Sequence, residues 1–138
     1  MANYILDKGL LATGGAVAYA FGEIGVLQSD GVSVARAGAA LAAGSLGVVV
    51  QENLDAAKTN TGKAVIDCRL LGIARVLCAT AAVVAPGNRI TSNASAQGVV
   101  MTAAGAFPGA AVLGIAMSAK SAGAVGFVEV LLTPGAQF

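Results

Sequence analysis

The sequence predicts a mainly β fold, in which two related β-rich units form a small antiparallel β-barrel or sandwich behind an extended N-terminal arm. Three observations support this prediction. Apolar and polar residues alternate along short segments, turn-forming residues separate those segments, and the chain repeats its own pattern at a nearly constant offset. Successive side chains of a strand point to opposite faces, so a period of two indicates half-buried strands rather than helices.

The chain is expected to divide into an arm over residues 1–10 and a single β domain over 11–138, with an internal repeat of about 11–73 and 74–133. The start of the arm is apolar apart from one amide and one phenolic hydroxyl, so it is a candidate contact with a neighbouring subunit. A frayed terminus is the alternative interpretation. The candidate contact residues are Ala2, Asn3, Tyr4, Ile5 and Leu6.

Alternation is clearest in four segments, GVSVAR at 31–36, VIDCRL at 65–70, GIARVLC at 72–78 and FVEVLL at 127–132. In each of them the apolar positions share one face and a polar or charged residue lies on the other. The residues expected to face inward are Val32, Val34, Ile66, Cys68, Leu70, Ala74, Val76, Cys78, Val128, Val130 and Leu132.

Turn signals separate the expected strands, and the last two strands form an expected hairpin with strands at 113–119 and 125–132 around a turn at 120–124. The polar stretch 52–63 fits either a solvated loop or a short helix capped at Asn53, and 37–43 fits a loop because its counterpart contains Pro108. The turn signals are Gly22, 29–31, 60–62, 86–88, 121–123 and 133–135.

The internal repeat is visible in paired landmarks. Gly31-Val32 recurs as Gly98-Val99, Ala37-Gly38-Ala39 as Ala104-Gly105-Ala106, and Leu46-Gly47-Val48 as Leu113-Gly114-Ile115, each time 67 positions later. Both halves therefore follow the same order of turns and strands, which indicates a duplication.

Charge is unusually scarce, at 11% of the 138 residues with a net charge of +1, where a typical soluble domain has about 25%. A balance so close to neutral gives no reason to expect nucleic-acid binding. A free surface with so few charges is prone to association. We therefore expect other protein subunits to cover much of it.

A membrane interpretation is disfavoured despite a mean hydropathy of +0.80. Residues 90–119 lack charge, but they begin with a polar run and are interrupted by Pro108, so no apolar stretch reaches the roughly 18–20 residues of a spanning helix. The start of the chain lacks the pattern of a signal peptide. Cys68 and Cys78 are expected to be reduced and buried.

Catalytic chemistry is poorly supported. The chain contains no histidine, and its seven carboxylates show no spacing that singles out a pair. The segment 59–64 resembles the end of a phosphate-binding loop, but Ala57 and Ala64 replace the residues that such a loop needs. We expect no enzyme activity, no cofactor and no metal.

The chain resembles the small decoration, or cement, proteins of tailed-phage capsids. The resemblance rests on the MAN start, two copies of a Gly-apolar strand unit (AVAYAFGEIGVL with GVSVARAGA, then APGNRI with AVLGIAM) and the ending VEVLLTPG. It implies a homotrimeric β-barrel protein on the exterior of the virion, which binds the major capsid protein and stabilises the shell against DNA pressure. It implies no catalytic residue.

Two alternatives remain at this stage. One is a tail or head–tail structural component of a phage. The other is a membrane-active β-protein, although the expected strands are shorter than the roughly 9–11 residues of a lipid-facing strand.

Overall fold

The computed structural model describes residues 5–13, 18–37, 46–50, 64–101 and 111–133, and those residues form strands and turns. The strands of the first half are β1 (Leu6–Ala12), β2 (Ile24–Leu27), β3 (Ser33–Arg36), β4 (Leu46–Val49) and β5 (Val65–Leu71). The strands of the second half are β6 (Ile73–Cys78), β7 (Arg89–Ser92), β8 (Gly98–Val100), β9 (Gly114–Ala116) and β10 (Gly126–Leu132).

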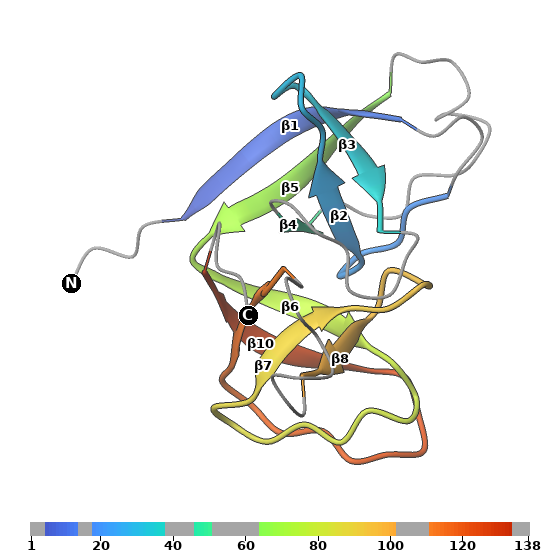
Figure 1. The fold of residues 1–138 in the computed structure, drawn as a ribbon, viewed down its shortest axis with the longest axis vertical. Coiled ribbons are helices and arrows are strands. Elements are labelled where there is room, and N and C mark those ends of the chain that lie inside the picture. The colour runs from blue at the N-terminus through green and yellow to red at the C-terminus, as the bar shows by residue number, and fades with distance from the viewer. Residues whose placement is uncertain (1–4, 14–17, 38–45, 51–63, 102–110, 134–138) are drawn as a thin grey trace.

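Each half closes into its own five-stranded barrel, and the two barrels are stacked along the long axis of the molecule (Figure 1). The first barrel has the strand order β1-β3-β2-β4-β5, and the second has the order β6-β8-β7-β9-β10. Corresponding strands of the two halves are therefore paired in the same order around each barrel. The prediction of a small β-barrel fold is confirmed. The division into an arm and a single domain remains a prediction.

The strand pairs differ in one respect from the antiparallel barrel that the sequence predicts. The pairs β1–β3 and β6–β8 are parallel, whereas the other pairs that close the barrels are antiparallel. In each half the β2–β3 or β7–β8 hairpin folds back beside the first strand of its barrel. Alternation along a strand does not encode which neighbour it takes, so the sequence did not reveal these two pairs.

The alternation itself is confirmed in β5, β6 and β10, where the expected inward residues are buried or nearly so and Arg75 and Glu129 are exposed. The expectation for Val32 is wrong, because this side chain is 52% exposed. Asp30 Oδ1 accepts the N–H groups of Val32 and Ser33, at 2.9 Å each. The turn therefore extends through Val32, and β3 begins only at Ser33, whose buried hydroxyl donates to Asp30 Oδ2.

Part of the segment 1–10, which the sequence predicts to be an arm, lies within the described residues. Strand β1 begins at Leu6 and pairs with β5 from Leu6↔Leu71 to Leu11↔Val65. Residues 6–10 are therefore part of the first barrel. Such pairing satisfies the backbone N–H and C=O groups, which an extended arm leaves to water or to a partner.

A shared core joins the barrels. One buried cluster contains second-barrel residues such as Val76 and Val130 together with Ile24 and Val48 of the first barrel. Ile24 N–H donates to the Ala96 carbonyl at 2.8 Å, and Leu77 N–H donates to the Gly22 carbonyl at 2.9 Å. A single residue, Gly72, separates β5 from β6. The two barrels therefore form one packed unit.

Two arginines bind across the junction in the same manner. Arg36 makes two bonds to the Glu23 carboxylate, at 2.8 and 2.9 Å, and donates to the Ser95 carbonyl of the second barrel at 2.8 Å. Arg69 makes two bonds to Asp7 and donates to the Ile73 carbonyl at 2.9 Å. Each guanidinium thus holds a carboxylate of the first barrel and a carbonyl of the second.

Candidate interaction surface

The most informative surface feature is a set of large apolar side chains that the barrels leave exposed. Some lie alone, as is normal on any protein, but most lie together on two adjoining parts of the molecule. The members of the whole set are Ile5, Leu6, Leu11, Val32, Val65, Leu71, Ile73, Val83, Ile115, Met117, Val125, Phe127 and Leu131.

The largest group lies on the outer face of β6, β10 and β9, which we call the outer ladder. Its first row runs Ile73–Leu131–Ile115 across three paired strands. Its second row runs Arg75–Glu129 and continues to Met117, whose N–H donates to the Glu129 carbonyl at 2.7 Å. The four apolar members of these rows are 37–50% exposed.

The third row of the outer ladder is Leu77–Phe127. The guanidinium carbon of Arg75 lies 4.9 Å from the centre of the Phe127 ring, a cation–π contact that fixes the Arg75 side chain over the sheet. Phe21 packs edge-on against the same ring, with the centroids 5.7 Å apart. Gly22 follows, at a positive φ of 83°, where an added Cβ would lie 2.7 Å from Phe127. The turn at Phe21-Gly22 therefore packs directly against Phe127 in the third row of the outer ladder.

The N-terminal end of β1 continues the apolar surface onto the first barrel. Ile5 and Leu6 are more than half exposed, and Leu6 is the strand partner of the partly exposed Leu71. Leu71 in turn lies two residues before Ile73 of the outer ladder. Of the five predicted contact residues, Ile5 and Leu6 are therefore at the surface, while Ala2, Asn3 and Tyr4 lie outside the described residues.

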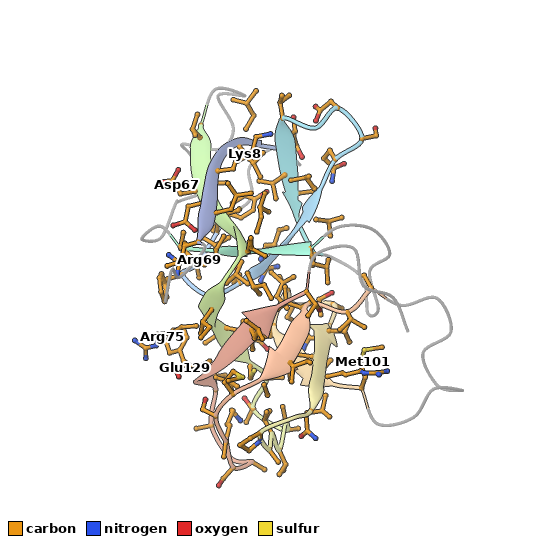
Figure 2. All side chains as sticks on the ribbon, turned by 90° about the vertical axis from the view of Figure 1, so that its left-hand side faces the viewer. Lys8, Asp67, Arg69, Arg75, Met101 and Glu129 are labelled. Atoms are coloured by element: carbon orange, nitrogen blue, oxygen red, sulfur yellow. The ribbon has the colours of Figure 1, made fainter. Side chains whose placement is uncertain are left out.

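Charged side chains follow the same side of both barrels. Figure 2 shows Asp67 and Arg69 on the first barrel and Arg75 and Glu129 on the second, all on one side of the molecule and opposite Met101. The Arg69 hydrogen bonds hold the pKa of Asp7 below its usual value. The pairing keeps Asp7 ionised and keeps Arg69 in place beside the apolar residues at the barrel junction.

Sequence reasoning missed the outer ladder because it assigned only the charged residues Arg75 and Glu129 to the outer faces of β6 and β10. The signal was present in adjacent apolar pairs. Leu70-Leu71 and Leu131-Leu132 each break the alternation, because one member of such a pair must face outward. One leucine of each pair is exposed as this rule requires. It is Leu71 in the first pair and Leu131 in the second.

A second apolar surface lies on the second barrel, next to the C-terminal end of β6 and to β8. It is a groove of about 370 Å³ lined by Ala79, Ala81, Ala82, Val83, Val99 and Val100. Its lining offers no charged group to orient a ligand, which sets it apart from the polar-tipped pockets that usually bind small molecules.

The thiols and carboxylates do not form a reactive site within the described part of the chain. Cys68 and Cys78 are buried and unpaired in different apolar clusters, and burial raises their pKa values to about 12 and about 11. They are therefore neutral thiols. The described ranges contain no group of three Cys, Asp or Glu residues placed to hold a metal ion. Among those same residues no helix is long and apolar enough to cross a membrane.

Comparison with known proteins gives a likeness in fold. No protein-family model matches the chain, and no curated protein matches it. The crystal structure of the head fiber gp8.5 N base of bacteriophage phi29 has a similar fold, with a TM-score of 0.58 at 10% sequence identity. The likeness covers 94% of this chain and 95% of the phi29 chain, so the two proteins share the whole of this architecture rather than one barrel of it.

Proposed function

We propose that the protein is a structural component of a tailed-phage head, attached to the outside of the shell as a decoration protein and acting without a reaction of its own. The observation that carries the proposal is the whole-chain likeness in fold to a phage head fiber base. The sequence resemblance to capsid decoration proteins points the same way from independent features. The neutral thiols and ion-paired carboxylates add no support for catalysis.

The proposed partner is the major capsid protein, which the protein would bridge to stabilise the shell against the pressure of packaged DNA. The proposed contact is the N-terminal end of the chain, from Ala2 to Leu6. Ile5 and Leu6 support it, because they are more than half exposed at the edge of the first barrel. Many copies on one lattice make even weak contacts effective, since their binding energies combine. The resemblance also implies a homotrimer, an assembly that the mass of the purified chain in solution would distinguish from a pair.

The test is binding to empty, expanded heads, measured as occupancy after co-sedimentation. Deletion of residues 2–5 is the appropriate variant, because a longer deletion would remove Leu6–Lys8 from β1 and open the first barrel. Val83→Ser is the matched control, since Val83 is exposed on the other barrel. We expect the deletion to lose occupancy and the control to keep it.

Unchanged occupancy of the deletion variant would reject the N-terminal contact. A failure of the unaltered protein to bind any form of the head would reject the proposed function itself. An image of the particle with this protein at the tail or connector would replace a decoration role by the tail or head–tail alternative.

A further inference from the structure

We propose that two copies of this chain pair face to face through their outer ladders. They are related by a two-fold axis that lies in the interface between the copies, parallel to the strands and over the line midway between β6 and β10. The occupant of the ladder is thus a second copy. The proposal rests on the strand register and the charges of the ladder, and it does not depend on the proposed function.

The register of β6 and β10 makes the ladder complementary to itself under this axis. Glu129 is the strand partner of Arg75, and Leu131 is the partner of Ile73. A two-fold axis between the strands and parallel to them places β6 of one copy over β10 of the other at the same height. Arg75 of each copy then lies opposite Glu129 of the other, and Ile73 lies opposite Leu131.

The charged row is also in the right place along the strands. It lies between the Ile73–Leu131 row and the Leu77–Phe127 row. Two sheets packed face to face cross at about 30°, so the middle row is displaced least from its partner. The cation–π contact with Phe127 already holds Arg75 over the sheet, which lowers the entropy cost of forming the intermolecular pair.

Charge distinguishes this axis from its neighbours. An axis along β10 would place Glu129 opposite Glu129, which is repulsive. An axis between β10 and β9 would place Glu129 opposite Met117 and leave a carboxylate without a partner in an apolar contact. Only the axis between β6 and β10 pairs opposite charges while it matches apolar residues.

The exposed apolar area of the ladder is small, which indicates a weak pair. A large side chain presents about 200 Å² when fully exposed, so exposures of 37–50% at Ile73, Ile115, Met117 and Leu131 leave roughly 350 Å² of apolar surface. A standard interface buries about 800 Å² per partner. The ladder with its charged row is smaller, so we expect a reversible pair with a micromolar dissociation constant rather than a permanent dimer.

The experiment measures the mass of the purified full chain by sedimentation equilibrium from the low to the high micromolar range. Wild-type protein is expected to shift from one chain to two. Arg75→Glu and Glu129→Arg each create facing like charges twice in the pair and are expected to weaken association at least about tenfold. A mixture of the two variants restores both opposite-charge contacts, so it is expected to associate where neither variant does alone.

Circular dichroism and thermal unfolding of each variant check that the barrels are intact, and the double variant Arg75→Glu with Glu129→Arg provides a second restoration within one chain. A monomeric wild type, single variants that associate as the wild type does, or a mixture that stays monomeric would each overturn the pair. A mass of three chains would overturn it in favour of the trimer that the resemblance implies. None of these results bears on head binding by the N-terminal variants.

Discussion

The Arg36–Glu23 pair at the junction of the barrels provides a quantitative test of how the two halves are held together. Replacing Arg36 by Met keeps most of the aliphatic volume and removes three hydrogen bonds, two to Glu23 and one to the Ser95 carbonyl. Glu23 is only 7% exposed, so its carboxylate would be left buried, with the hydrogen bond from the Ala20 N–H but without the guanidinium.

The magnitude follows from this burial. Breaking a buried ion pair by removing one partner costs about 3–5 kcal/mol. The Arg36 side chain is 30% exposed, so water can partly reach the site, and we expect a loss of about 3 kcal/mol in the free energy of unfolding. The Arg69–Asp7 pair has similar bonds but a more exposed carboxylate, so Arg69→Met should cost only about 1 kcal/mol or less.

Urea unfolding of Arg36→Met, Glu23→Gln and the double variant gives the coupling energy. Glutamine keeps an acceptor for the Ala20 N–H while removing the charge, so the double variant should cost about 2 kcal/mol, less than Arg36→Met alone. A loss below about 1 kcal/mol for Arg36→Met, or strictly additive losses, would show that the buried carboxylate does not depend on the guanidinium.

Three further results are expected. Gly114→Ala should lower stability by about 2 kcal/mol in thermal unfolding, because its Cβ would overlap the backbone of β10; an unchanged Tm would contradict this packing. Asp7 has a lowered pKa in the folded protein, so its contribution to the free energy of unfolding is present above the unfolded pKa of about 4 and is lost as the pH falls further. Arg69→Met should flatten that acid-dependent loss of stability, and an identical dependence of the free energy of unfolding on pH would exclude the Arg69–Asp7 pair as its cause. Cys68 and Cys78, with pKa values of about 12 and about 11, should resist a thiol reagent at pH 8 in the native state and react fully in urea; rapid native labelling would contradict their burial.

The sequence was sufficient to predict which residues of the long strands face inward. Ile66, Cys68, Val76 and Val128 follow the alternation because each strand of a closed barrel has one face toward its interior and one toward solvent. Val32 did not follow it, since its N–H donates to the Asp30 side chain and this turn delays the start of β3.

Contacts between elements were less accessible. Alternation reports the face of a residue but not its neighbour across the sheet, so it did not reveal the parallel β1–β3 pair or the shared core around Ile24. The same limit applies to the candidate surface. The sequence identified the apolar start of the chain, but the row from Ile73 to Ile115 depends on strands that are distant in sequence.

Barrel closure has a consequence for a protein that would be concentrated on a regular lattice. Every described strand has a hydrogen-bonded neighbour on both sides, so no described strand presents an edge that is unpaired along its whole length. Among the short pairings, β1–β3 joins two residue pairs and β6–β8 joins one. Closure therefore reduces the edge that could template fibrous aggregates when copies are crowded. Contacts between copies depend on side chains, and substitutions at the surface can adjust their strength one residue at a time without altering the barrels.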